Sequence, residues 1–288
     1  MTNYSAVFCV ESEEDILQCK CLMRSVFGDA MDFVEMFFNR FFHYNIYGIK
    51  AENEIVSMAF ILPSCIKING RVNGRINSVS YVYACATNPN HRGMGLMRRI
   101  LDTIFDLCAE KGDAAIFLLP ANEPLYGFYE KMGFEDFFYW QKNVFQKQNL
   151  STSISEGIVI KKINVSEYQS YRNDYLKNIH FVDYPLSHFQ FIETINVIKE
   201  SGLYGVFYRH HIQGCIYIEK NQDQLFLKEF LVEEELKDCV LSYLLDYYHV
   251  DRLEYIKPNP QSKSALIRWA PGFEWMRDKK GYFNFALD

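Results

Sequence analysis

Hydrophobic and polar positions alternate along three stretches near the start of the chain, which predicts strands over residues 46–50, 55–68 and 76–86. The breaks between them contain Glu52-Asn53 and two Asn-Gly pairs, which are typical of tight turns. Before the strands, apolar residues recur at helical spacing, which predicts helices over residues 12–27 and 31–42. The first half is therefore expected to be a mixed sheet with helices packed on it.

A further apolar helical face begins at Leu96 and ends near Lys111-Gly112. The run Asn90-His91-Arg92-Gly93-Met94-Gly95 joins the last strand to this helix. The first turn of a helix has N–H groups without partners and carries about half a positive charge, so it can hold a phosphate group. Glycines also occur at such junctions for purely conformational reasons. This segment alone leaves both interpretations open.

The segment after this helix helps to decide between a phosphate site and a purely conformational role for the glycines. Residues 114–119 predict a short apolar strand, and a loop with Asn122 and a short helix follow it. Pro124 lies near the expected start of that helix and Gly133 just after its end. The order is therefore strand, Arg-x-x-Gly turn, long helix, strand, Asn-containing loop, and Phe-Tyr-Glu-Lys-x-Gly-Phe over residues 128–134.

This order resembles the GCN5-related N-acetyltransferase (GNAT) superfamily over roughly the first half of the chain. The acyl-CoA signature of that family is Gln/Arg-x-x-Gly-x-Gly/Ala, and Arg92, Gly95 and Met97 take its three positions. Met97 departs from the pattern, because the last position is usually small. Residues 91–98 are similar to the His-Arg-x-x-Gly-Leu-Leu/Met-Arg variant found in the branch with the enhanced intracellular survival acetyltransferases.

The resemblance implies acetyl-CoA as cofactor and a set of residues around it. In the superfamily a bulged strand before the turn supplies N–H groups to the reacting carbonyl, and an Asn contacts the pantetheine arm or a nearby water. The cofactor-binding residues implied in this chain are Tyr83, Ala84, Cys85, Ala86, Thr87, Arg92, Gly93, Met94, Gly95, Leu96, Met97 and Asn122. An ordinary loop-capping role is the alternative for Asn122.

Acyl transfer from a thioester to an amine needs a base for the amine and an acid for the departing thiolate. The resemblance implies Tyr129 as the acid, with a tyrosine packed in the core as the alternative. For the base it points to Asp288, because in some relatives the terminal carboxylate enters the first active site. His91 is expected beside the phosphate or in solvent. Cys85 has no histidine partner visible in the sequence, so a buried strand residue is favoured over an acyl-enzyme nucleophile.

In the superfamily the first two helices contribute to the acceptor site. In this chain they carry an aromatic group made of Phe27, Phe33, Phe37, Phe38, Phe41 and Phe42. The helical spacing of these rings favours a place in the core, and the lining of an acceptor channel is the alternative.

Residues 146–155 are polar and lack apolar periodicity, which predicts a linker between a catalytic GNAT domain at 1–148 and a degenerate GNAT-like domain at 149–288. In the second half, strands are expected at 203–208, 212–219, 225–232 and 253–257, with a helix from Leu236 to Leu245 before the last strand. Pro258 is expected to end that strand. Where the first half has its glycine turn, Glu233, Glu234 and Glu235 would repel a pyrophosphate. The expected fold class is α+β (mixed α/β), with tandem acyl-CoA N-acyltransferase domains.

Composition limits the function further. The chain has 288 residues and a formal net charge of −6, which argues against nucleic acid as the principal partner and suits a cationic acceptor. No apolar leader and no run of about 18 apolar residues occur, so we expect a cytoplasmic protein without a membrane partner. The cysteines and histidines lack the spacing of metal ligands, so no metal site is expected.

The sequence therefore predicts an N-acetyltransferase that moves an acetyl group from acetyl-CoA directly to an amine of a small molecule or peptide, through a ternary complex. A non-catalytic acyl-CoA sensor or scaffold is the first alternative. Transfer of aminoacyl groups from tRNA to cell-wall peptides is another, and the acidic balance counts against it. The identity of the acceptor and the oligomeric state, a homo-oligomer included, stay open.

Overall fold

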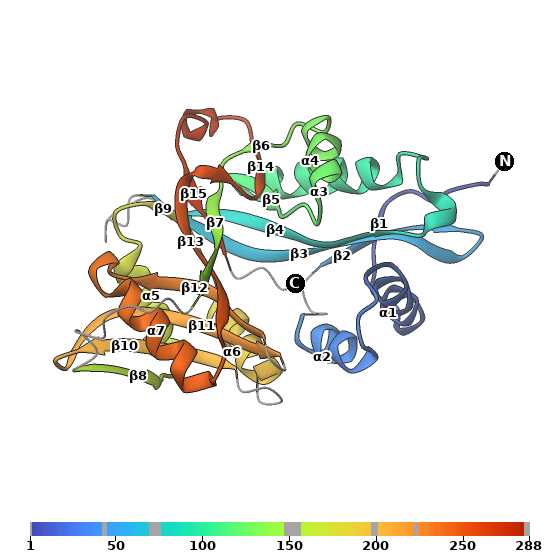
Figure 1. Cartoon of the computed structure of the whole chain (residues 1–288). Coiled ribbons are helices and arrows are strands. Elements are labelled where there is room, and N and C mark those ends of the chain that lie inside the picture. The colour runs from blue at the N-terminus through green and yellow to red at the C-terminus, as the bar shows by residue number, and fades with distance from the viewer. Residues whose placement is uncertain are drawn as a thin grey trace. The chain divides into compact units, whose positions relative to one another are not determined.

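The computed structural model describes residues 2–41, 45–68, 76–146, 157–196, 201–221 and 224–284. The chain forms two compact units, and neither of them is continuous in sequence (Figure 1). Unit 1 contains residues 1–66, 76–137 and 265–278. Unit 2 contains residues 67–75, 138–264 and 279–288.

Unit 1 is built on a mixed β-sheet. In spatial order its strands are β1 (Phe8–Cys9), β2 (Ile46–Ala51), β3 (Glu54–Lys67), β4 (Ile76–Thr87), β5 (Ala115–Leu118), β14 (Leu266–Trp269) and β6 (Glu135–Asp136). Strands β4 and β5 are parallel, and β14 runs antiparallel to β5. The three long strands predicted in the first half are confirmed, with ends that differ by one residue.

Helices cover both faces of this sheet (Figure 1). Helices α1 (Glu13–Phe27) and α2 (Met31–Phe41) lie on one face, and α3 (Leu96–Glu110) and α4 (Glu123–Glu130) lie on the other. The predicted ends of α1 are confirmed. The Ser12 side chain accepts a hydrogen bond from the Asp15 N–H, and Gly28 ends the helix in a left-handed conformation.

The core beneath α3 explains why this helix forms. Its buried side chains recur at the predicted three- and four-residue steps and are Leu96, Met97, Ile100, Leu101, Ile104 and Cys108. They pack against residues of the sheet that include Ile49, Val82 and Ile116. Helix α3 therefore holds the turn before Leu96 in a fixed position on the sheet.

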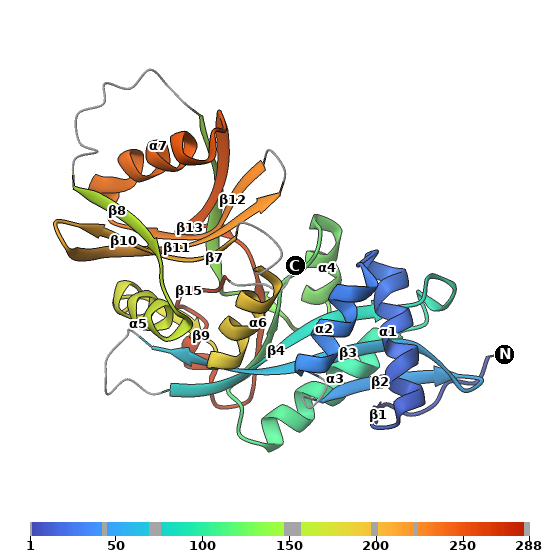
Figure 2. The ribbon, with the colours of Figure 1, turned by 90° about the horizontal axis from the view of Figure 1, so that it is seen from below.

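Unit 2 contains a six-stranded sheet. In spatial order its strands are β7 (Tyr139–Gln146), β13 (Arg252–Lys263), β12 (Gln224–Val232), β11 (His211–Asn221), β10 (Gly202–Tyr208) and β8 (Ile158–Lys162). Helix α7 (Lys237–Tyr248) covers one face, while α5 (Val165–Tyr175) and α6 (Leu186–Asn196) cover the other (Figure 2). Strands β9 (His180–Asp183) and β15 (Gly281–Tyr282) form a parallel pair in the same unit.

The two units repeat one topology. Each has a helix pair before or among its first strands, a run of antiparallel strands, a parallel step across one long helix, and an antiparallel strand beside the last. The parallel step is β4–α3–β5 in unit 1 and β12–α7–β13 in unit 2. The predicted α+β fold with tandem domains is confirmed.

Each unit contains a strand that lies on the other side of the predicted boundary at residue 148. Strand β14 lies between β5 and β6 in unit 1, and β7 pairs with β13 in unit 2. The compact units therefore differ from the contiguous segments 1–148 and 149–288 of the sequence prediction. Of the predicted linker at 146–155, only Gln146 lies within the described residues.

One strand prediction is wrong. Strand β13 does not stop at Pro258 but continues to Lys263. Among the described residues, its ladder with β12 covers Leu253–Tyr255, so Pro258 lies beyond the end of that ladder. On the other side, the ladder with β7 shifts register after Pro258. A proline is tolerated at such an edge, because no ladder hydrogen bond needs its missing N–H.

Candidate functional site

Strand β4 changes its backbone conformation where it leaves β5. The β4–β5 ladder covers Val79–Tyr81 and Ala115–Phe117. Beyond it, Ala84 has a φ of 50° inside the strand, a left-handed conformation that is rare for alanine and typical of a bulge. A bulge of this kind interrupts the regular ladder at this point of β4. This is where the sequence predicted a bulged segment over Tyr83, Ala84, Cys85, Ala86 and Thr87.

The turn between β4 and α3 is held by its own backbone and side chains. The Asn88 side chain accepts a hydrogen bond from the Asn90 N–H, and residues Pro89–His91 form one turn of 3₁₀ helix. The Arg92 Nε donates a hydrogen bond of 3.2 Å to the Thr87 carbonyl oxygen. These contacts fix the path of the chain into α3.

Gly93 and Gly95 both need the conformational freedom of glycine. Their φ values are 77° and 72°, and a Cβ added at either position would have no atom within 4 Å. The Arg99 N–H is bonded to the Gly95 carbonyl oxygen, so the N–H groups earlier in this turn precede the helical ladder. The result is an open stretch of backbone donors at the start of α3.

The side chains around these donors point two ways. Leu96 and Met97 are buried in the core beneath α3, while Met94 is 61 % exposed. Met97 therefore does not fill the space in front of the turn, although its size departs from the family pattern. His91 contacts Tyr4, with 3.1 Å between its Nδ1 and the Tyr4 hydroxyl.

Tyr129 of α4 reaches strand β4. Its side chain is buried, and its hydroxyl forms a hydrogen bond with the thiol of Cys85. Burial, followed by the charge and hydrogen bond of Cys85, raises the pKa of Tyr129, so the hydroxyl keeps its proton at neutral pH. The structure thus joins the predicted acid to the bulged segment.

Cys85 is a poor nucleophile in this setting. Burial raises the pKa of its thiol to about 12, and the hydrogen bond from Tyr129 offsets only part of that shift. A thiol reacts as the thiolate, which is nearly absent at neutral pH for such a group. Burial and the raised pKa of Cys85 therefore favour the predicted role of a buried strand residue over that of a nucleophile.

The rates at which two cysteines react with iodoacetamide test the raised pKa of Cys85. At pH 8 we expect iodoacetamide to modify the exposed Cys21 and to modify Cys85 about 10³-fold more slowly, because the thiolate fraction falls with every unit of pKa. Mass spectrometry of tryptic peptides measures both sites in one sample. Equal rates at Cys85 and Cys21 would contradict the raised pKa.

Asn122 immediately precedes α4. It is exposed, and its side chain makes no capping hydrogen bond to this helix. Its carbonyl oxygen accepts a hydrogen bond from the Leu125 N–H at 3.1 Å. A side-chain helix cap is thus not its role, and its amide remains exposed beside the helix that carries Tyr129.

The aromatic group of α2 belongs to the core. Phe37, Phe38 and Phe41 are almost fully buried. The Phe37 ring lies 5.0 Å from that of Tyr83, measured between centroids, and 5.0 Å from that of Phe60. Phe37 therefore packs against the bulged strand at Tyr83, and Phe38 and Phe41 extend the same core. Phe27 is 44 % exposed, and Phe42 lies outside the described residues.

The start of α7 in unit 2 lacks the features of the unit 1 turn. Residues 232–237 contain no glycine and no residue with positive φ. Glu234 pairs with Lys237 at 2.5 Å and with Lys257 at 3.0 Å, and these contacts lower its pKa. Ionised carboxylates at this position oppose the binding of a second anion.

Some predictions fall outside what the structure describes. Asp288, the predicted base, lies outside the described residues, although the preceding Phe283 and Asn284 are buried in unit 2. Within the described residues, no group of His, Cys, Asp and Glu side chains is arranged to hold a metal ion. Nor does any helix there combine the length and the apolar character that a membrane crossing requires.

Comparison with known proteins finds a family match over part of unit 1. Residues 11–137 match the acetyltransferase (GNAT) domain, while no curated protein matches the chain in sequence.

Solved structures share the fold over most of the chain. A GCN5-related N-acetyltransferase from Kribbella flavida superposes with a TM-score of 0.72 at 14 % identity, covering 93 % of this chain and 71 % of that one. Eis1 from Mycobacterium abscessus gives 0.63 at 11 % identity, covering 92 % and 74 %. A tandem GNAT protein from the clavulanic acid biosynthesis pathway gives 0.55 at 12 % identity, covering 93 % and 98 %. At these identities the likeness shows a shared fold.

Proposed function

Because residues 11–137 match the acetyltransferase (GNAT) domain, we propose that this protein is an acetyl-CoA-dependent N-acetyltransferase. In the proposed reaction, the acetyl group passes directly to an amine of a small molecule or peptide within a ternary complex. The observation that best supports the proposal is the contact of the buried Tyr129 side chain with Cys85, a residue of the bulged strand that leads into the open turn.

The turn suits the diphosphate of coenzyme A. An anion at the start of α3 would meet exposed N–H groups and the positive end of the helix dipole. The open space at Gly93 and Gly95 would let that anion approach the backbone closely. The burial of Met97 keeps its side chain out of this space. Residues 92–97 are therefore the proposed pyrophosphate site.

Cofactor and chain have separate parts in the proposed chemistry. When bound, acetyl-CoA supplies an activated acetyl thioester. The N–H groups of the segment from Tyr83 to Thr87 would stabilise negative charge on the reacting oxygen, since they lie where β4 has left the ladder. The Tyr129 hydroxyl would hold the proton that the leaving thiolate needs. Asp288 stays a prediction as the base.

Two measurements on one sample test the proposal. Titration calorimetry with acetyl-CoA is expected to show micromolar binding. Release of free thiol in the presence of a panel of amines, which includes polyamines, aminoglycosides, amino acids and peptides, is expected to show turnover. Binding without turnover on any amine would favour the acyl-CoA sensor or scaffold. Absence of binding would contradict both functions.

Two replacements of Cys85 test whether its hydrogen bond orients the acid. Cys85→Ser keeps a side chain that can bond to Tyr129, whereas Cys85→Ala removes it. A hydrogen bond contributes about 1 kcal/mol, so we expect the alanine variant to lose about fivefold in kcat and the serine variant to lose much less. The KM for acetyl-CoA should stay the same in both. If both variants kept the kcat of the unmodified protein, the contact would have no part in turnover.

A further inference from the structure

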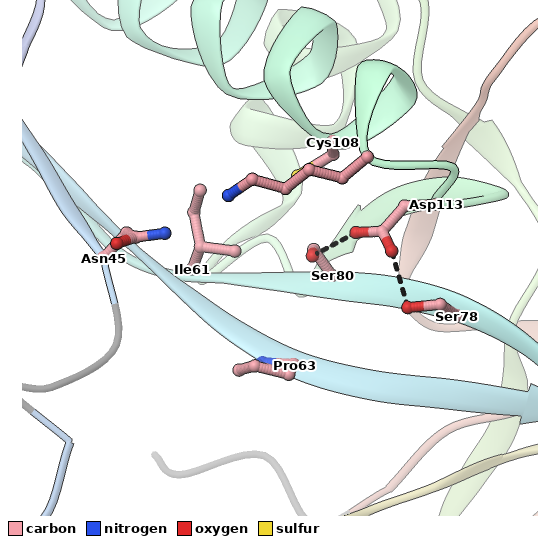
Figure 3. Close-up of a pocket in the computed structure, with 8 residues that line it drawn as sticks. Asn45, Ile61, Pro63, Ser78, Ser80, Cys108 and Asp113 are labelled. Atoms are coloured by element: carbon pink, nitrogen blue, oxygen red, sulfur yellow. Dashed lines mark hydrogen bonds between the residues drawn. The ribbon is translucent and has the colours of Figure 1, made fainter.

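A cavity lies at the far end of unit 1 from the proposed cofactor turn. Its volume is about 230 Å³, and Figure 3 shows residues that line it. It lies against the start of β4, at Ser78 and Ser80, and the end of α3, at Cys108. The cofactor turn joins the opposite ends of these two elements, about 20 Å away along a helix of this length. The proposed acetyl transfer does not use this cavity.

Asp113 provides a fixed negative charge in this cavity. Its carboxylate accepts a hydrogen bond of 2.5 Å from the Ser78 hydroxyl and one of 2.7 Å from the Ser80 hydroxyl (Figure 3). Its own N–H is bonded to the Cys108 carbonyl oxygen at 2.9 Å. Each carboxylate oxygen keeps a further lone pair for a ligand. The carboxylate is thus oriented before any ligand arrives.

Lys111 provides a positive charge in the same cavity. It follows the last residue of α3 and is exposed, and among the described residues no carboxylate forms an ion pair with it. Burial is the main cause that raises the pKa of the Cys108 thiol to about 11, and of the nearby charges Asp113 raises this pKa further while Lys111 lowers it. The two opposite charges therefore share one small space.

The remaining walls are polar at one point and apolar elsewhere. Asn45 contributes an amide that can donate or accept a hydrogen bond. Ile61 and Cys108 are buried and form an apolar surface, while Pro63 is exposed. A ligand that fits these walls is small, charged at both ends and apolar on one side.

We propose that this cavity binds a small α-amino acid as a zwitterion, with its ammonium group toward Asp113 and its carboxylate toward Lys111 and Asn45. An anion alone would meet the Asp113 carboxylate, and a cation alone would meet the Lys111 ammonium. A neutral ligand would bring no opposite charge to either group. An apolar side chain on the amino acid would pack against Ile61 and Cys108.

The binding experiment uses the full chain and three kinds of ligand. Titration calorimetry with each of the common α-amino acids is expected to find at least one that binds. The matching amine without the carboxylate and the matching acid without the amine should each bind at least about tenfold more weakly, because each loses a hydrogen bond to a charged group. Equal binding of the amine or the acid, or no binding of any amino acid, would overturn the proposal.

Variants locate the binding in this cavity. Asp113→Asn and Lys111→Met should each weaken the amino acid at least about tenfold. Asp106→Asn and Lys131→Met, which change exposed residues of the same unit, should leave the affinity unchanged. Lys111→Met is the decisive variant, because Lys111 is exposed and forms no ion pair among the described residues. Asp113, by contrast, accepts hydrogen bonds from Ser78 and Ser80 of β4, so its replacement could also disturb the fold. Full affinity in Lys111→Met would overturn the proposal.

An amino acid could also be the amine acceptor of the proposed reaction. The Gly95→Glu variant separates the two sites, because it is expected to lose acetyl-CoA and to keep amino-acid binding in this cavity. If Lys111→Met left amino-acid affinity unchanged in a protein that still acetylates amines, only the second site would be contradicted. If the unmodified protein did not bind acetyl-CoA, only the proposed acetyltransferase function would be contradicted.

Discussion

Replacing Gly95 by glutamate is expected to abolish acetyl-CoA binding. Gly95 has a φ of 72° at the start of α3, so a side chain there strains the backbone by about 1–2 kcal/mol. A carboxylate at this position would also place negative charge where the diphosphate is proposed to bind. We expect the Kd from titration calorimetry to rise at least about 10²-fold, since charge repulsion and lost N–H contacts act together.

Gly112 offers a matched control for this variant. It follows α3 at the other end, has a φ of 88°, and a Cβ added there would also have no atom within 4 Å. Gly112→Glu therefore introduces the same residue into the same backbone conformation. We expect a similar loss of thermal stability in both variants and a loss of acetyl-CoA binding in Gly95→Glu alone. Binding that survives in Gly95→Glu would mean that the site is misplaced.

The local signals in the sequence were sufficient for most elements of unit 1. The cap at Ser12, the left-handed end at Gly28 and the apolar face of α3 each depend on residues a few positions apart. Such interactions are visible in a linear sequence, because they recur with the period of the helix. The glycine turn before Leu96 is local in the same way.

Strands β7 and β14 could not be assigned by this reasoning. Residues of β14 pair with β5, although Leu266 and Leu118 are far apart in the chain. A four-residue strand has no period long enough to indicate its partner. The same strand carries Arg268, which forms an ion pair of 2.7 Å with Asp102 and lies over the Phe105 ring, so it helps to hold α3. No local pattern in the sequence indicates this role.

The contact between Tyr129 and Cys85 shows the same limit at the candidate site. Each residue was assigned from its own motif, one in the bulged strand and one in the short helix. Their hydrogen bond depends on α4 and β4 meeting on one face of the sheet. No spacing rule predicts a phenol bonded to a thiol. The pairing converts two separate predictions into one site that mutation can test.

Replacing Tyr129 by phenylalanine is expected to reduce kcat while leaving the binding of acetyl-CoA intact. The ring is buried and packs against Phe134, so phenylalanine keeps the shape and removes only the hydroxyl. Loss of a general acid lowers the rate of proton transfer about 10²-fold or more. The raised pKa of Tyr129 has a second consequence. The unmodified protein should show no fall in kcat from this group below about pH 10, the usual pKa of tyrosine.

Tyr126→Phe is the matched control for this variant, because Tyr126 lies on the same helix, is half-buried and packs against the same core. Steady-state rates of thiol release and titration calorimetry, measured on both variants, separate a chemical role from a structural one. If Tyr126→Phe and Tyr129→Phe lost activity equally, with equal falls in thermal stability, the hydroxyl of Tyr129 would be part of the packing. A loss of kcat confined to Tyr129→Phe, with an unchanged Kd for acetyl-CoA, is the result expected of a proton donor at the thiolate. A packing defect would instead weaken the cofactor site as well, because that site lies in the same small unit.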